Sequence, residues 1–206
     1  MKKQLINYET LLKVTKAISH SKDPEEIAIM TVEGIKTTLE AKGCALFLFD
    51  RKKEQLIMGA SSGLSDEYIN KGPLKVLPEL TESLKQGEVL AIYDVLNDPR
   101  IQYPKEARKE GITSLLSVPI IVGGNLIGVL RVYTIEPWEF TLGDVNFVQA
   151  LAQIAGISLT MARYIRGLKN SIDVLKTMRE VQVRRTTRKT PYEGVPVSVS
   201  LDELNK

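Results

Sequence analysis

The stretch GITSLLSVPIIVGGNLIGVLRVY, residues Gly111–Tyr133, decides the fold class. Its two apolar runs, SLLSVPIIV and NLIGVLRVY, flank Gly123 and Gly124, where a backbone φ above zero costs little. Such a pair predicts a β-hairpin with a two-residue turn. Because Pro119 lies inside the first run and cannot donate a hydrogen bond to a neighbouring strand, we expect a bulge or an unpaired edge there. The other elements can be assigned outward from this hairpin.

Three more strands are predicted before the hairpin. GCALFLFD, residues Gly43–Asp50, is apolar on both alternating faces, which is typical of a central strand that is covered on both sides. QLIMGASS (Gln55–Ser62) follows a charged turn and completes a first hairpin, and VLAIYDV (Val89–Val95) predicts a third strand. Since a hairpin lies at each end of this series, we expect an antiparallel sheet of about five or six strands in an α+β fold.

Helices are predicted before and after these strands. The first covers residues 4–20, and the second begins at Asp23, which can cap it while Glu26 completes a capping box. A second capping box, Thr141–Asp144, opens the longest helix. We expect these terminal helices on one face of the sheet. The other face is predicted to carry a short helix at Pro78–Gln86 and a polar lid that follows the third strand and includes one or two helical turns at Lys105–Glu110.

A helical extension and a basic tail are predicted to follow the globular part. The extension carries apolar residues in steps of four and three, two heptads of a coiled-coil seam formed by Met161, Ile165, Leu168, Ile172 and Leu175. After about Met178 the pattern ends, and the rest predicts a flexible basic tail with one short strand, Val195–Leu201. We therefore expect an N-terminal helix (1–20), a globular domain (21–166) and a C-terminal extension (167–206).

The composition excludes several classes of site. The net charge is only +3 in 206 residues, so no basic face points to nucleic acid. One cysteine, Cys44, excludes an intrachain disulfide and a cysteine-rich metal site, and one histidine, His20, excludes a multi-histidine metal centre. The N-terminus lacks a signal-peptide pattern, and no run approaches the roughly 20 apolar residues of a membrane span. We expect a cytoplasmic protein with no membrane or nucleic-acid partner.

The order and spacing of these segments resemble the GAF domain, a signalling module related in fold to PAS domains. The matching pieces are GCALFLFD, DVLNDPR, GITSLLSVPI, LIGVLRVYT and EFTLGDVNFVQALAQIAGISLTMAR, which together span roughly residues 8–166. The resemblance implies a ligand pocket between the sheet and the lid. GAF domains bind cyclic nucleotides, bilins, haem, iron or amino-acid metabolites, and some have no known ligand.

Several functions of the family do not fit these residues. Bilin-binding members use a cysteine in the lid region and haem-binding members an axial histidine in the pocket, whereas this lid contains neither residue type. Free methionine sulfoxide reductases use several pocket cysteines, and Cys44 alone cannot complete a thiol–disulfide cycle. The Asn-Lys-Phe-Asp-Glu signature of many cyclic-nucleotide-binding members does not occur in this sequence, which weakens that assignment.

Eight positions are candidate walls of the implied pocket, and Arg131 is the most specific of them. If Arg131 points under the lid, its guanidinium would bind a carboxylate or phosphate bidentately; if it faces the rim, it is solvated or pairs with a glutamate. We expect Asp94, Asp98 and Arg100 in the lid region to be structural. The full set of candidates is Ala45, Phe47, Met58, Ala60, Leu77, Tyr93, Tyr103 and Arg131.

The sequence favours a non-enzymatic, small-molecule sensor that dimerises through its first and last helices and is read by a downstream protein. The lid lacks cysteine and histidine, and no two carboxylates have a spacing that forces them together, so the sequence indicates no catalytic residue. No metal or cofactor is predicted. The alternative is a degenerate GAF domain that acts only as a dimerisation scaffold. Its pocket would be filled by its own bulky side chains, such as Phe47, Met58 and Tyr103.

Overall fold

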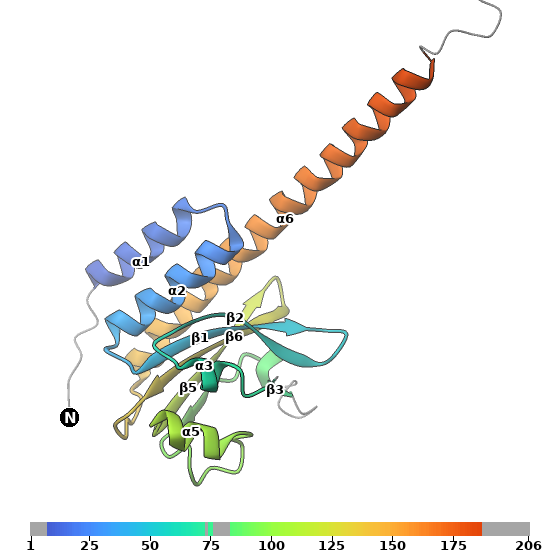
Figure 1. Ribbon diagram of the computed structural model, residues 1–206. Helices are drawn as coiled ribbons and strands as arrows, with labels where there is room; N and C mark the ends of the chain where they lie inside the picture. The colour runs from blue at the N-terminus through green and yellow to red at the C-terminus, as the bar shows by residue number, and fades with distance from the viewer. Residues whose placement is uncertain (1–7, 73, 76–82, 187–206) are drawn as a thin grey trace, which may run out of the picture. The chain divides into compact units, whose positions relative to one another are not determined.

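The computed structural model describes residues 8–72, 74–75 and 83–186 (Figure 1). The chain forms two compact units, Met1–Tyr164 and Ile165–Lys206. The elements in chain order are α1 (Tyr8–His20), α2 (Pro24–Thr38), β1 (Gly43–Asp50), β2 (Gln55–Ser62), α3 (Asp66–Ile69), β3 (Leu74–Lys75), β4 (Leu90–Ile92), α5 (Pro104–Glu110), β5 (Ser114–Val122), β6 (Asn125–Thr134) and α6 (Leu142–Thr186).

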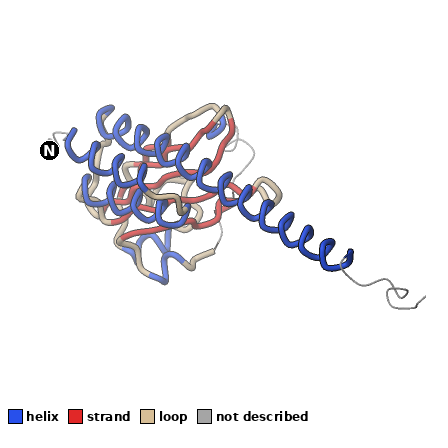
Figure 2. Tube along the Cα trace, turned by 90° about the horizontal axis from the view of Figure 1, so that it is seen from above, coloured by secondary structure: helices blue, strands red, loops and turns tan. Residues whose placement is uncertain are grey.

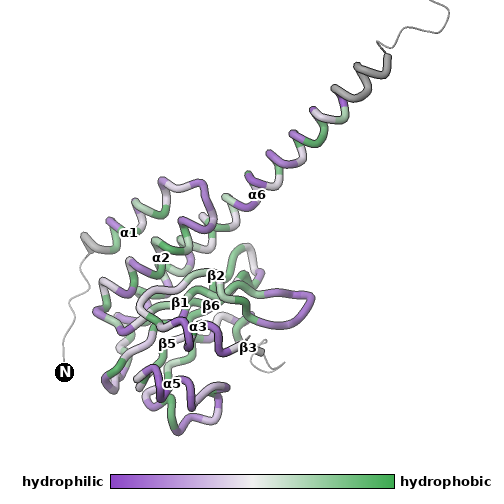
Figure 3. Tube along the Cα trace, in the orientation of Figure 1, coloured by the Kyte–Doolittle hydropathy of each residue, from purple (hydrophilic) through white to green (hydrophobic). Residues whose placement is uncertain are grey.

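The strands form one six-stranded sheet in the order β3-β2-β1-β6-β5-β4, with every pair antiparallel. This confirms the predicted α+β fold. The central strand β1 is buried from Gly43 to Phe47 because both faces of the sheet are covered. Figure 3 shows the same division, with hydrophobic central strands and a polar α5.

One face of the sheet is covered by α1, α2 and the part of α6 that belongs to the first unit (Figures 1 and 2). We call the core on this side the helix-face core. Its largest fully buried members are aliphatic, and each stabilises the fold by roughly 1.5–3 kcal/mol relative to an exposed position. They include Ile18, Ile27, Ile35, Leu46, Leu116 and Ile120.

The opposite face carries the lid-face core, on which α3, α5 and the loops around them pack (Figure 1). This core contains two tyrosines, Tyr68 and Tyr133, among its buried residues. Its aliphatic members include Leu56, Leu74, Ile92, Val95, Ile112 and Leu115. The predicted helical turns of the lid are therefore confirmed as α5.

Hydrogen bonds at the helix starts explain where α2 and α6 begin. At α6, the Thr141 N–H donates to Asp144 Oδ2 at 2.8 Å and the Asp144 N–H donates to Thr141 Oγ1 at 3.2 Å, which confirms the predicted capping box. At α2, Asp23 caps the helix by accepting from the Glu25 N–H at 2.8 Å. The predicted bond from the Asp23 N–H to the Glu26 carboxylate is wrong, because Glu26 instead accepts a hydrogen bond from the Ser21 hydroxyl at 2.5 Å.

The β5–β6 hairpin turns at Gly123 and Gly124, whose positive φ angles of 56° and 73° favour glycine. The bulge expected near Pro119 occurs one peptide further on, between Ile120 and Ile121. On the other side of β5, the registered pairing with β4 ends at Ser117. Pro119 is therefore outside the β4 ladder, where its missing N–H costs no strand pairing.

Two predictions about the first hairpin and its loop are wrong. Ala60 does not share the lid face with Met58, because a bulge opposite Leu46 and Phe47 inserts Gly59 and turns Ala60 into the helix-face core. The segment expected to be loop between Gly63 and Lys75 contains α3 and β3. The Ser65 hydroxyl caps α3 by accepting from the Tyr68 N–H, a signal that is visible in the sequence.

The described part of the second unit, residues 165–186, is helical. The helix thus extends past Met178, where the sequence predicts a tail. The side chains at Leu168, Ile172 and Leu175 are 49%, 50% and 65% exposed, so the predicted seam is uncovered. The predicted strand Val195–Leu201, and residues 4–7 and most of the predicted helix Pro78–Gln86, lie outside the described residues.

Among the described residues, α6 contains an 18-residue window with a mean hydropathy of 1.4, enough for a membrane span by length and composition. However, 44% of this window is buried inside the protein. A core helix of a soluble protein has the same properties, so this window does not indicate a membrane protein.

Candidate functional site

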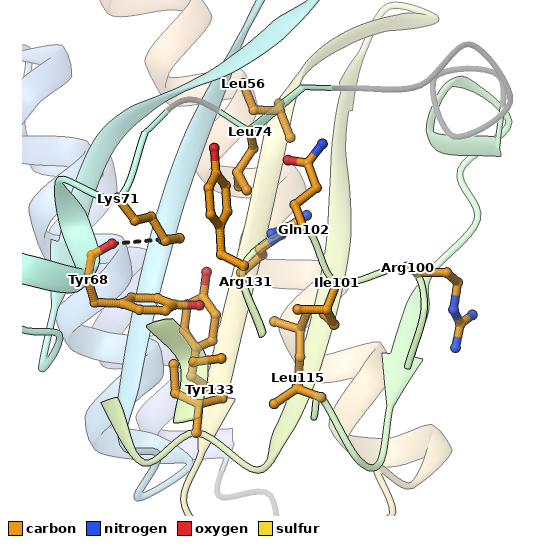
Figure 4. Close-up of a pocket in the computed structure, with 14 residues that line it drawn as sticks. Leu56, Tyr68, Lys71, Leu74, Arg100, Ile101, Gln102, Leu115, Arg131 and Tyr133 are labelled. Atoms are coloured by element: carbon orange, nitrogen blue, oxygen red, sulfur yellow. Dashed lines mark hydrogen bonds between the residues drawn. The ribbon is translucent and has the colours of Figure 1, made fainter. Parts of the chain in front are cut away.

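A cavity lies on the lid side of the sheet, between β5 and β6 below and the lid and the segment around α3 above (Figure 4). The volume within the cavity that is open to the centre of a water molecule is about 60 Å³. Apolar side chains form most of its wall, and the polar groups come from a few named positions. Its lining consists of Leu56, Tyr68, Lys71, Leu74, Val95, Arg100, Ile101, Gln102, Tyr103, Ala107, Ile112, Leu115, Arg131 and Tyr133.

Arg131 reaches this cavity because residues 129, 131 and 133 of β6 alternate onto the lid face. The carbon of its guanidinium lies 5.6 Å from the centroid of the Phe47 ring, a distance typical of a cation–π contact. Its Nε is buried and has no hydrogen-bond partner among the described residues. Of the two orientations that the sequence left open, the structure shows the one under the lid.

Tyr133, two residues further along β6, contributes a second buried polar group. The residue is 2% exposed, and its hydroxyl forms no hydrogen bond of ordinary geometry within the described part of the chain, although the side chains of Arg131 and Tyr68 lie near it. Its ring packs edge-on against Tyr68, with centroids 5.7 Å apart and planes at 84°. Burial raises the pKa of both phenols, so both hydroxyls stay neutral and can donate a hydrogen bond.

Lys71 brings a second cation to the cavity from the segment after α3 (Figure 4). Its Nζ lies 3.5 Å from the centroid of the Tyr68 ring and donates to the Tyr68 carbonyl oxygen at 2.9 Å. Burial, followed by the positive charge of Arg131, lowers the pKa of Lys71 to about 8, although Glu106 and Glu110 act in the opposite direction. At neutral pH most of this ammonium is therefore still charged.

Glu110, the last residue of α5, connects the lid to the body. Its side chain is 6% exposed, and Oε1 lies 3.1 Å from Lys42 Nζ, just before β1. The same carboxylate accepts from the Ser65 hydroxyl and, at 3.0 Å, from the Ser65 N–H. This arrangement, which we call the Glu110 cluster (Lys42, Ser65 and Glu110), ties together α3, α5 and the start of β1 beside the cavity.

The structure brings two of the eight predicted wall residues, Tyr103 and Arg131, to the cavity. Ala45 and Phe47 belong to the lid-face core, and Met58 packs partly buried against it, but these three do not line the cavity. Tyr93 is 54% exposed. Ala60 lies in the helix-face core, and Leu77 falls outside the described residues.

Arg100 also belongs to the lining, but its guanidinium points away from the other charged groups in Figure 4. It forms two bonds with Asp98, from Nε to Oδ1 at 2.8 Å and from Nη2 to Oδ2 at 2.5 Å. The Asp94 carboxylate accepts from the Leu96 N–H and from the Asn97 side chain. These contacts fit the structural role that the sequence predicts for this turn.

Four polar residues of the cavity, Tyr68, Lys71, Gln102 and Tyr133, were missed by sequence reasoning. Tyr133 could have been found, since it lies two residues from Arg131 in a strand and hence on the same face. Tyr68 and Lys71 follow from the α3 segment, whose place over the sheet has no periodic signal. Among the described residues, no group of three histidine, cysteine or acidic side chains could hold a metal ion.

The family model of the GAF domain matches residues 23–159. The chain belongs to the GAF family. A curated relative, the methyl sulfide methyltransferase-associated sensor of Methanosarcina acetivorans, is 24% identical over 172 residues, 81% of this chain. The chain spans only 17% of that relative's length.

Solved GAF domains share the fold. That of a phosphoenolpyruvate-protein phosphotransferase from Coxiella burnetii has a TM-score of 0.70 and 22% identity, covering 81% of this chain and 99% of that one. The free methionine-R-sulfoxide reductase of Neisseria meningitidis, solved with its substrate, has a TM-score of 0.64 and 17% identity, covering 77% and 90%. At these identities the likeness shows the fold of this GAF domain alone.

Cys44 does not provide a reductase-type nucleophile in this GAF domain. It is fully buried in the helix-face core, on the other side of the sheet from the cavity. Burial raises the pKa of its thiol, which keeps it protonated and unreactive. The polar groups that the described residues bring to the cavity include Arg131, Lys71 and the tyrosine hydroxyls.

Proposed function

We propose that this GAF domain is a sensory module for signal transduction that binds a small anionic molecule in the cavity under the lid. The observation that carries the proposal is the pair of buried, unpartnered groups, Arg131 Nε and the Tyr133 hydroxyl. A buried polar group without a partner costs about 1–3 kcal/mol. A carboxylate or phosphate would accept hydrogen bonds from both groups and remove this cost.

A non-enzymatic role is supported by the chemistry of the cavity. No cysteine, histidine, aspartate or glutamate is among the residues that line it in the described part of the chain. The groups most often used as nucleophile or general base are thus missing from its wall. The sensor name of the Methanosarcina relative supports the same role.

Transmission of the signal requires a ligand that prefers one of two conformations. We propose a homodimer that is built on the first and last helices and read by a downstream protein. The strand that supplies Arg131 and Tyr133 is followed directly by the segment that starts α6. In that segment, the Trp138 N–H donates to Ser114 Oγ at 3.0 Å, and the Thr141–Asp144 capping box follows. A shift of β6 on binding would therefore act on α6.

Native mass spectrometry of the purified chain, followed by denaturation of the same sample, tests this function. We expect a bound small molecule, or, in its absence, a rise in Tm with small carboxylates or phosphates. Arg131→Met should weaken that binding at least tenfold, because the bidentate donor is lost. Arg51→Met, which removes the same charge from an exposed turn, is the control. A protein without any bound or binding anion would favour the scaffold alternative.

A further inference from the structure

We propose that the ligand of this cavity is a small dianion, bound by Arg131 and Lys71 together. The class includes short dicarboxylates and phosphate monoesters. This inference rests on the proposed function, because it specifies the ligand of the same cavity.

Within the described part of the chain, the cavity has two cationic side chains without an acidic partner. Neither Arg131 nor Lys71 forms an ion pair within the described residues. Arg131 contacts the face of Phe47, and Lys71 contacts the face and the carbonyl oxygen of Tyr68. Ring faces and a carbonyl compensate a desolvated charge only partly. A ligand with two negative charges would neutralise both cations, whereas a monoanion would leave one of them uncompensated.

The acidic groups nearest to Lys71 do not replace such a ligand. Lys71 faces Tyr68 of α3, Arg131 and Tyr133 of β6, and Glu106 and Glu110 of α5. Glu110 is already bonded to Lys42 and Ser65. The net influence of these neighbours and of burial leaves the pKa of Lys71 below its ordinary value, at about 8, which is the opposite of what a close carboxylate partner would produce.

Size and polarity narrow the ligand further. A water needs about 10–15 Å³ of such volume, so 60 Å³ corresponds to roughly four to six water-sized groups. Small dianions such as malonate or methyl phosphate are close to this size. The apolar wall, including Leu56, Leu74 and Leu115, keeps the dielectric low and strengthens the attraction between ligand and cations. The neutral hydroxyls of Tyr68 and Tyr133 add donors without adding charge.

The charge of Lys71 gives the site a defined pH dependence. The ammonium is present below pH 8 and is lost as the pH rises through this value. If the dianion requires the ammonium, the affinity falls about tenfold between pH 7 and pH 9, since the protonated fraction falls by about that factor.

Calorimetric titration of the full chain with three probes tests the inference: malonate, its monoamide malonamate, and methyl phosphate. Malonate and malonamate have the same number of heavy atoms and differ by one charge. We expect malonate or methyl phosphate to bind at least tenfold more tightly than malonamate at pH 7. Lys71→Met should abolish this preference. Lys71→Arg should keep it and also keep the affinity at pH 9.

Lys109→Met, which removes a charge from an exposed lid position, is the control and should leave the preference unchanged. Circular dichroism of each variant verifies that it is folded. If malonate and malonamate bind equally well and both depend on Arg131, the inference of a dianionic ligand is wrong and the proposed function still holds. No Arg131-dependent binding of any probe would overturn both. A preference between malonate and methyl phosphate identifies the acidic group.

Discussion

The buried hydroxyl of Tyr133 carries a cost in the free protein that a ligand can remove. Its ring is packed against Tyr68, so only the oxygen lacks a partner within the described chain. We predict that Tyr133→Phe leaves the free energy of unfolding unchanged or raises it by about 1 kcal/mol, because the unpartnered group disappears and the ring remains. The same substitution should weaken ligand binding. Urea denaturation of the ligand-free protein and calorimetry measure the two effects.

Tyr93→Phe is the matched control for this prediction. Tyr93 is 54% exposed and does not line the cavity, so we expect neither stability nor affinity to change. A loss of more than about 1 kcal/mol in Tyr133→Phe would mean that the hydroxyl supports the fold, and would contradict its role as a ligand group.

At the scale of residues, the sequence predicts the site only where a strand pattern places it. A charged residue inside an apolar strand made Arg131 predictable, and Tyr103 was found as an aromatic residue in the lid. Lys71 could not be predicted, since its approach to the cavity depends on how the segment after α3 crosses the sheet. Ala60 was misplaced because a one-residue bulge at Gly59 changes the face, and alternation alone does not reveal a bulge.

The Glu110 cluster governs how firmly the lid elements are attached to the sheet. We predict that Glu110→Gln lowers the free energy of unfolding at pH 7 by about 1 kcal/mol or somewhat more, because a buried carboxylate with two Ser65 donors and the Lys42 ammonium is replaced by a neutral amide. Hydrogen exchange should become faster in α3 and α5. Urea denaturation and exchange mass spectrometry measure these effects.

The pH dependence of this variant has a definite sign. Burial acts to raise the pKa of Glu110, but the hydrogen bonds from Ser65 and the charge of Lys42 outweigh it, so the pKa lies below its ordinary value of 4.5. The contribution of Glu110 to stability is therefore present above pH 4.5 and is lost as the pH falls through the lowered pKa. The difference between wild type and Glu110→Gln should shrink at pH 3.

Glu67→Gln is the control, because the Glu67–Lys109 pair joins the same two lid helices but is 73% and 71% exposed. We expect no measurable change in stability from this variant. An equal loss in both variants would contradict a special role for Glu110.

At the scale of elements, long periodic segments were predictable and short ones were not. Strands β1, β2, β5 and β6 follow from their apolar runs and from the turns between them, such as the one at Gly123 and Gly124. The elements α3 and β3 have only four and two residues, too few for a period to show. The end of α6 was misjudged because helix formation continues after the apolar seam stops.

At the scale of the whole molecule, the proposed signal passes from the cavity to the long terminal helix through β6. Arg131 and Tyr133 lie in β6, and the Thr141–Asp144 capping box starts α6 a few residues after that strand ends. A ligand that pulls on β6 thus acts at the beginning of the helix that carries the seam. A ligand produces a signal in this way only if a second helix packs on the seam and the ligand changes the position of that helix.

The predicted seam supplies the test of that requirement. Met161, Leu168, Ile172 and Leu175 are each about half or more exposed in one chain, which is unusual for large apolar residues at regular spacing unless another helix covers them. We predict that the full chain is a dimer of twice 23.0 kDa in light scattering, and that Leu168→Glu with Leu175→Glu converts it to the monomer, since opposed carboxylates cannot be desolvated in the seam.

Asn170→Glu with Thr177→Glu adds the same two charges on the opposite side of the helix and should leave the dimer intact. Because the described lining of the cavity lies within the GAF domain of one chain, the monomeric seam variant should still bind any anion that wild type binds. Anion binding that survives in a monomer separates recognition from transmission: the first belongs to the GAF domain alone, and the second requires the helix pair. A wild-type monomer would remove the seam from the mechanism and leave β6 and α6 to act on a different partner.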